Sequence, residues 1–182
     1  MTEQALLVVD LQNDFCSGGA LEVQQADQIV PRINKVMNKF KLVVASQDYH
    51  PPETIHFNQW PVHCVKGTAG AEFHPDFLRN QVALVVRTGT TSEDHGYSAF
   101  ESTEVDLSNY LKSQGVKKLY VCGLATDYCV KESVLAALEN GFETFVLTDC
   151  IKAVNVNPHD GEKAVEEMKG KGALLITSDD LN

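Results

Sequence analysis

The stretch Lys118-Leu-Tyr-Val-Cys-Gly-Leu-Ala-Thr-Asp-Tyr-Cys-Val130 joins a short apolar run to a helical pattern. Residues 119–122 form the kind of apolar run that makes a buried strand, and Gly123 permits a sharp turn after it. From Tyr128 onward the apolar residues recur at helical spacing, at Val130, Val134 and Leu138. The stretch therefore predicts a buried strand that turns directly into a helix.

Cys129 falls in the first turn of this predicted helix. A thiol there faces unpaired backbone N–H groups and the positive end of the helix dipole, which favour the nucleophilic thiolate. The same N–H groups can stabilise an oxyanion during acyl transfer. The alternative interpretation is that Cys129 is a small buried hydrophobic residue, as we expect of Cys122 in the middle of the strand.

Strand and helix patterns alternate on both sides of this stretch. Further strands are predicted at residues 5–10, 41–48, 82–87, 143–148 and 173–177, and further helices at 27–40, 105–114 and 158–169. Such alternation favours a mostly parallel sheet with helices on both faces and right-handed crossovers.

Two of the predicted strands end in carboxylates, Asp10 and Asp48, at the edge of a parallel sheet where ligands gather. The long segment that follows Asp48, to about residue 80, lacks helix or strand periodicity, and loops of this length are usually functional. A carboxylate with several imidazoles suits Zn²⁺, Mn²⁺ or Fe²⁺. The candidate ligands are Asp48, His50, His56 and His63, and the alternative is that these histidines are scattered surface residues.

Composition limits the class of protein. The 182 residues carry a net charge of −10 with 43% hydrophobic residues, which predicts one soluble domain and disfavours nucleic acid and membranes as partners. The first four residues lack the features of a signal peptide, and an odd count of five cysteines is typical of reduced thiols, so we expect a cytoplasmic protein. No G-x-G-x-x-G follows the first strand, which disfavours a dinucleotide cofactor.

Taken together, the motifs resemble the nicotinamidase/pyrazinamidase family within the isochorismatase-like hydrolases, over nearly the whole chain. The motifs are Val9-Asp-Leu-Gln-Asn-Asp-Phe-Cys16, Ser46-Gln-Asp-Tyr-His50 with His56, Trp60-Pro-Val-His-Cys64, Tyr97-Ser-Ala-Phe100 and Gly123-Leu-Ala-Thr-Asp-Tyr-Cys129. The resemblance implies an isochorismatase-like hydrolase fold, which is a three-layer α/β/α arrangement. It also implies one domain over residues 1–182 with a metal-binding loop insertion at about 48–80.

The resemblance further implies hydrolysis of nicotinamide to nicotinate and ammonia in NAD salvage, and acceptance of pyrazinamide. Cys129 would be the nucleophile and Asp10 its base, and one divalent ion (Zn, Mn or Fe) would be held by Asp48, His50 and His63, with His56 a fourth ligand in some members. The N–H groups of Ala125 and Cys129 would form the oxyanion hole, beside a cis peptide bond between Leu124 and Ala125. The residues expected to bind the substrate are Phe15, Leu21, Trp60, Tyr97 and Tyr128. The partner would be a small-molecule amide, and a homo-oligomer stays open.

One position departs from this family. Its catalytic lysine falls nine residues before the tyrosine of the Tyr97 motif, where this chain has Thr88, followed by Gly89. A threonine supplies no cation, so we expect a slow amidase. Strand alternation turns the neighbouring Arg87 to the opposite face, although a bulge or a strand end could bring it back. The alternatives are a related hydrolase of another small amide and a catalytically weak ligand-binding relative.

Overall fold

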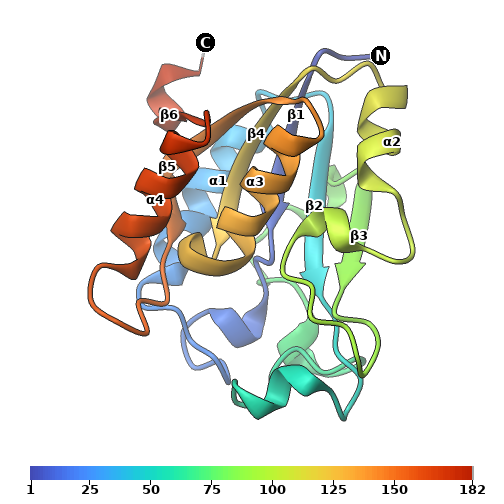
Figure 1. The fold of residues 1–182 in the computed structure, drawn as a ribbon, viewed down its shortest axis with the longest axis vertical. Coiled ribbons are helices and arrows are strands. Elements are labelled where there is room, and N and C mark those ends of the chain that lie inside the picture. The colour runs from blue at the N-terminus through green and yellow to red at the C-terminus, as the bar shows by residue number, and fades with distance from the viewer. Residues whose placement is uncertain (182) are drawn as a thin grey trace.

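The computed structural model describes residues 1–181, and a six-stranded sheet forms its middle layer (Figure 1). The strands are β1 (Gln4–Val9), β2 (Val43–Asp48), β3 (Leu84–Thr88), β4 (Lys118–Leu124), β5 (Glu143–Lys152) and β6 (Leu174–Ile176). Their order across the sheet is β3-β2-β1-β4-β5-β6, and every neighbouring pair is parallel.

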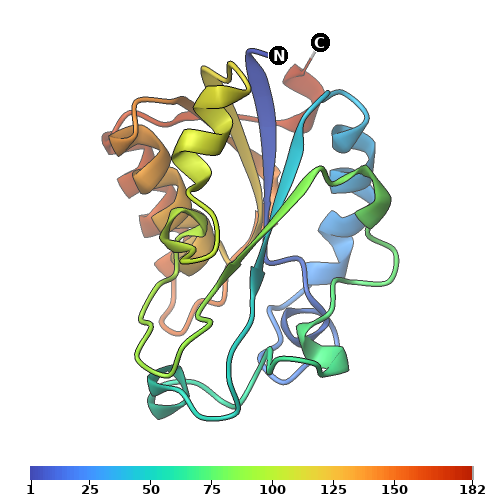
Figure 2. The ribbon, with the colours of Figure 1, turned by 90° about the vertical axis from the view of Figure 1, so that its right-hand side faces the viewer.

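Helices cover both faces of this sheet, as Figure 2 shows edge-on. The helix α1 (Val30–Met37) packs on one face, and the helices α2 (Leu107–Ser113), α3 (Lys131–Glu139) and α4 (Asp160–Gly170) pack on the other. The expected three-layer α/β/α fold is confirmed. Because both faces are covered, a strand such as β1 is a continuous apolar run from Ala5 to Val9 rather than an alternating one.

The strand β1 divides the hydrophobic core into its two halves. Leu6 and Val8 pack on the side of α1, whereas Leu7 and Val9 pack on the side of α2 to α4. The chain runs outward from β1 in opposite directions, to β2 and β3 on one side and to β4, β5 and β6 on the other. In open parallel sheets, ligands bind at the carboxyl ends of the strands near such a reversal.

Several predicted boundaries differ from the structure. The helix expected at residues 27–40 is a 3₁₀ turn, Ala26–Ile29, followed by the shorter α1. The helix expected from Tyr128 begins as a single π-helical turn, Thr126–Val130, which contains Cys129 and runs into α3. The strand expected to end at residue 148 continues to Lys152 through an irregularity in its pairing with β4. Among the residues described, no helix has the length and apolar character needed to cross a membrane.

Candidate active site

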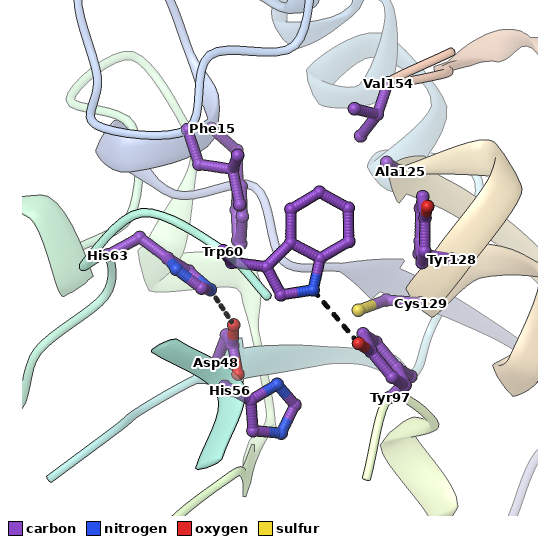
Figure 3. Close-up of a pocket in the computed structure, with 11 residues that line it drawn as sticks. Phe15, Asp48, His56, Trp60, His63, Tyr97, Ala125, Tyr128, Cys129 and Val154 are labelled. Carbon is purple, nitrogen blue, oxygen red and sulfur yellow. Dashed lines mark hydrogen bonds and ion pairs between the residues drawn. The ribbon is translucent and has the colours of Figure 1, made fainter. Parts of the chain in front are cut away.

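A pocket opens at the carboxyl ends of the strands, where the long loop after β2 meets the turn that carries Cys129 (Figure 3). All five residues expected to bind the substrate line it, namely Phe15, Leu21, Trp60, Tyr97 and Tyr128. Asp48, His56, His63, Ala125, Cys129 and Val154 complete the lining. Residues from distant parts of the sequence, from Phe15 to Val154, therefore line one cavity that is rich in aromatic side chains.

Asp10 follows β1 directly and lies beneath this pocket. Its backbone has a φ of 45°, a conformation that residues other than glycine rarely adopt, and its side chain is 1% exposed. The hydroxyl of Ser46 donates to Oδ1 of Asp10 at 2.6 Å and accepts from the Asp10 N–H at 3.2 Å. The other oxygen, Oδ2, is buried and has no hydrogen-bond partner among residues 1–181. This carboxylate is therefore held on one side by Ser46 and free to take a proton on the other.

Asp10 and Cys129 interact, and burial shifts both groups toward their protonated forms. Burial raises the pKa of Asp10 to about 7 and the charge of Asp48 adds to this, whereas Ser46 and Cys129 oppose it. Burial raises the pKa of the Cys129 thiol well above its usual range, and the charges of Asp10 and Asp48 add to the rise. The position at the start of a helix favours a thiolate, whereas burial and the two carboxylates raise the pKa of the Cys129 thiol. A base beside the thiol, such as Asp10, opposes this rise when it takes the proton.

Asp48, His50 and His63 bring their ligand atoms within 4.8 Å of one another, and all three residues are buried. Nε2 of His50 lies 2.9 Å from Oδ2 of Asp48, and Nε2 of His63 lies 3.2 Å from the same oxygen. The opposite nitrogen of each ring, Nδ1, donates to a backbone carbonyl, that of Gly89 for His50 (3.0 Å) and that of Pro61 for His63 (2.7 Å). This fixes the tautomer that leaves both Nε2 atoms free to bind a metal, so the residues fit a divalent ion.

His56 lies beside this group but does not join it. Its ring centroid lies 4.6 Å from that of His50, and it is absent from the set of three converging ligands. Its Nε2 is buried without a hydrogen-bond partner among residues 1–181, and burial lowers the pKa of its imidazole. The structure therefore brings three ligand atoms together, and a role of His56 as a fourth ligand stays a prediction.

Gln12 fixes the backbone of Asp48, a role that sequence reasoning missed. The Oε1 atom of Gln12 accepts the Asp48 N–H at 2.8 Å, and its Nε2 donates to the carbonyl of Asp48 at 2.7 Å and to that of Ala71 at 2.8 Å. Gln12 is fully buried, so each of its polar atoms needs such a partner. The signal was the position of this glutamine two residues after Asp10, within a motif that also carries Phe15.

Thr88 and Arg87 lie on opposite faces of β3. Thr88 is 2% exposed and pairs in register with Asp48 of β2, on the face that carries the site. Arg87 instead donates from Nε to Oε1 of Gln47 at 3.1 Å, and its guanidinium carbon lies 4.3 Å from the centroid of the Tyr49 ring. Arg87 is thus committed to the other face. Within the residues described, no lysine or arginine lines the pocket.

Aromatic side chains close the mouth of the pocket. Nε1 of Trp60 donates to the hydroxyl of Tyr97 at 3.0 Å, and the rings of Trp60 and Tyr128 meet edge to face with centroids 4.9 Å apart (Figure 3). Ala125 lines the same cavity beside Cys129, and the peptide bond between Leu124 and Ala125 is cis, as expected.

A second group with possible metal ligands, Cys16, Asp27 and His74, lies outside this pocket. Nδ1 of His74 accepts the backbone N–H of Asp76 at 3.1 Å, so Nε2 keeps its proton and donates to Oδ1 of Asp27 at 3.2 Å. This tautomer is the reverse of the one at His50 and His63. The group is therefore a hydrogen-bonded cluster that ties two loops together.

The fold and the site define a class of protein, an α/β/α protein with a thiol and a carboxylate side by side beneath a cavity that has candidate metal ligands in its wall. Comparison with known proteins agrees with this class. The family model for the isochorismatase domain matches residues 4–180. A nicotinamidase of Escherichia coli (strain K12) is 37% identical, and the match covers 97% of this chain and 96% of the relative. The chain belongs to the isochorismatase family.

Solved structures of similar proteins extend the comparison. The crystal structure of a pyrazinamidase of Pyrococcus horikoshii in complex with zinc has a TM-score of 0.89 at 42% identity, covering 97% of this chain and 99% of that one. The crystal structure of PnC1 from L. infantum in complex with nicotinate has a TM-score of 0.94 at 34% identity, covering 100% of this chain and 96% of that one. With these relatives, the chain is a hydrolase that acts on an amide bond.

Proposed function

We propose that this hydrolase converts nicotinamide to nicotinate and ammonia through a thioester on Cys129, and that it also accepts pyrazinamide. The observation that supports this most is the placement of Cys129 and Asp10 together beneath an aromatic cavity with Asp48 and His63 on its wall. A flat aromatic amide fits such a cavity, and the relatives act on or bind such molecules.

In the proposed reaction, Asp10 takes the proton of Cys129 as the sulfur attacks the amide carbon. The N–H groups of Ala125 and Cys129 stabilise the oxyanion. When the C–N bond breaks, Asp10 gives the proton to the leaving nitrogen and ammonia departs. Water then attacks the thioester, Asp10 takes a proton from it, and the C–S bond breaks to give nicotinate. That proton returns to the sulfur and restores the thiol.

We propose that Asp48, His50 and His63 hold one divalent ion, and that His56 lines the ring site beside it. A bound Zn²⁺, Mn²⁺ or Fe²⁺ would act there as a Lewis acid toward the ring nitrogen of the substrate. Phe15, Trp60 and the other aromatic residues of the pocket would enclose the ring. The ring nitrogen and the amide would then be directed to opposite ends of the cavity.

We also propose that the chain is a slow amidase. Both Asp10 and Cys129 are shifted toward protonation, and the pocket lining described here offers no lysine or arginine to oppose that shift. Thr88 marks the position at which the related enzymes are expected to carry a lysine. A second candidate function is hydrolysis of a different small amide. The observation that favours it is again Thr88, since a threonine in place of the expected lysine also changes the shape of the site.

We place this activity in the recycling of nicotinamide toward NAD, by a single domain that spans residues 1–182 and works in the cytoplasm. The five cysteines are all unpaired, which supports a reducing compartment.

The deciding experiment measures ammonia released from nicotinamide by the purified protein loaded with Zn²⁺ or Mn²⁺. We expect slow release that disappears in Cys129→Ala and persists in Cys122→Ala, a matched change at a buried thiol in the middle of β4. Release from another carboxamide but not from nicotinamide would favour the second candidate. Release from no amide would leave a ligand-binding protein.

A further inference from the structure

Asp127 lies two residues before Cys129, in the same π-helical turn, yet the reaction proposed above gives it no role. Its side chain is 8% exposed, and it is not part of the pocket lining. Oδ1 accepts the backbone N–H of Val154 at 2.9 Å, and Oδ2 accepts that of Asn155 at 2.8 Å. One buried carboxylate therefore binds two consecutive N–H groups, which is a charge-assisted arrangement.

These two N–H groups belong to the connection between β5 and α4. Val154 projects from this connection into the pocket wall near Ala125 (Figure 3). The next residue, Asn155, has a φ of 53°, and its side chain accepts the N–H of Gly161 at 2.8 Å. The connection is thus held to α4 at one end and to the turn of the nucleophile at the other.

We propose that Asp127 is a positioning residue that sets the distance between Cys129 and the Val154 wall, and through it which aromatic rings the pocket accepts. The turn that carries the sulfur and the segment that carries the wall are far apart in sequence, and the Asp127 carboxylate joins their backbones directly. The proposal rests on the proposed function, because it takes the ring of the substrate to bind in this pocket. We expect that loss of the two hydrogen bonds to Asp127 weakens binding of the substrate ring more than it slows the chemical step.

Trp60 provides a readout that does not depend on turnover. It is the single tryptophan of the chain and it lines the pocket, so its fluorescence reports ligand binding there. Nicotinate, the product, serves as the probe. In Asp127→Asn the amide places an NH₂ group against one of the two backbone N–H groups, so one hydrogen bond is lost and the other loses its charge.

We expect Asp127→Asn to raise the Kd of nicotinate and the KM of nicotinamide on the order of tenfold each, with kcat changed far less. The matched control is Asp160→Asn at the first residue of α4, where the carboxylate accepts the N–H of Asn157 at 2.8 Å and does not line the pocket. The control should leave Kd and KM unchanged. Val154→Ala should weaken nicotinate binding by itself, and the double variant with Asp127→Asn should lose little more than the larger single effect.

Several outcomes would overturn the proposal. They are an unchanged Kd and KM in Asp127→Asn with a lowered kcat, an equal effect in Asp160→Asn, or fully additive effects with Val154→Ala. If Asp127→Asn does not fold, unchanged nicotinate binding by Val154→Ala is enough to reject it. If wild-type protein binds nicotinate but hydrolyses no amide, the proposed reaction fails, while the fluorescence titrations still decide the role of Asp127.

Discussion

Replacing Thr88 by lysine tests whether the site lacks a cation. Burial raises the pKa of Asp10 from 3.8 to about 7, which corresponds to about 4 kcal/mol against the ionised carboxylate. An ammonium about 4 Å away, at an effective dielectric constant near 20, attracts a carboxylate by about 4 kcal/mol. The two magnitudes are comparable, so one cation is enough to offset the penalty of burial.

The geometry of β3 allows such a cation to approach the site. Thr88 is in register with Asp48 on the face that carries the site, and β1 with Asp10 is the second strand away, at roughly 10 Å. A hydroxyl on Cβ ends far short of that distance, whereas lysine places its charge on a flexible four-carbon stem. We expect Thr88→Lys to raise kcat/KM on nicotinamide about 100-fold, which requires about 2.7 kcal/mol of the available attraction.

The pH profile gives the same test a second readout. A cation favours the carboxylate, so the pKa of Asp10 falls and the acidic limb of kcat/KM moves from near pH 7 to lower pH. Thr88→Met, a long side chain without charge, is the control for volume and should gain nothing. Arg87→Ala should keep the wild-type rate, because Arg87 contacts Gln47 and Tyr49 on the other face. A folded Thr88→Lys protein with no gain in rate, or an equal gain in Thr88→Met, would refute the reasoning.

Three further predictions concern the ligand set and the base. His63→Ala should lose bound zinc by elemental analysis while His159→Ala, at an exposed histidine, keeps it; full occupancy in the first would reject the ligand set. Gln12→Met should weaken zinc binding about tenfold or more in a competition titration, because the backbone of Asp48 loses its two hydrogen bonds to the Gln12 side chain. An unaltered zinc affinity would show that these hydrogen bonds do not matter for the ligand set. Asp10→Asn should abolish turnover yet raise the Tm at pH 8. The carboxylate ionises more readily in the unfolded chain than in the folded one, so ionisation destabilises the fold as pH rises from 3.8 toward 7; an unchanged or lower Tm would contradict this.

The fold could be predicted from the sequence because each strand is a separate apolar run with a helix after it. The limits of the elements could not, because tertiary contacts determine them. The chain from Thr126 to Val130 shows this most clearly, since helical spacing predicts an ordinary first turn and the structure has a π-helical one. Similarly, β5 extends to Lys152 by pairing with Leu124 of β4, a contact that local sequence does not encode.

The pocket residues could be predicted from motifs, but the contacts that position them could not. Phe15, Trp60 and Tyr97 line the cavity as the resemblance implied. The contacts of Asp127 could not be predicted, because its partners, the N–H groups of Val154 and Asn155, lie more than twenty-five residues away in the sequence. The ring of His56 packs beside that of His50, and its role as a fourth ligand stays a prediction, because histidine spacing does not determine which rings converge on Asp48.

The position of the site in the sheet explains why its charge balance is delicate. The order β2-β1-β4 brings Asp48, Asp10 and the Cys129 turn to one edge of the sheet, each at the buried carboxyl end of a strand. Burial there excludes water, which strengthens every electrostatic interaction but also penalises each uncompensated negative charge. A metal on Asp48 would compensate one carboxylate and leave the thiolate and Asp10 without a partner of opposite sign. The same strand ends that assemble the site therefore create a need for one more positive charge, and β3 is the neighbouring strand from which a side chain could supply it.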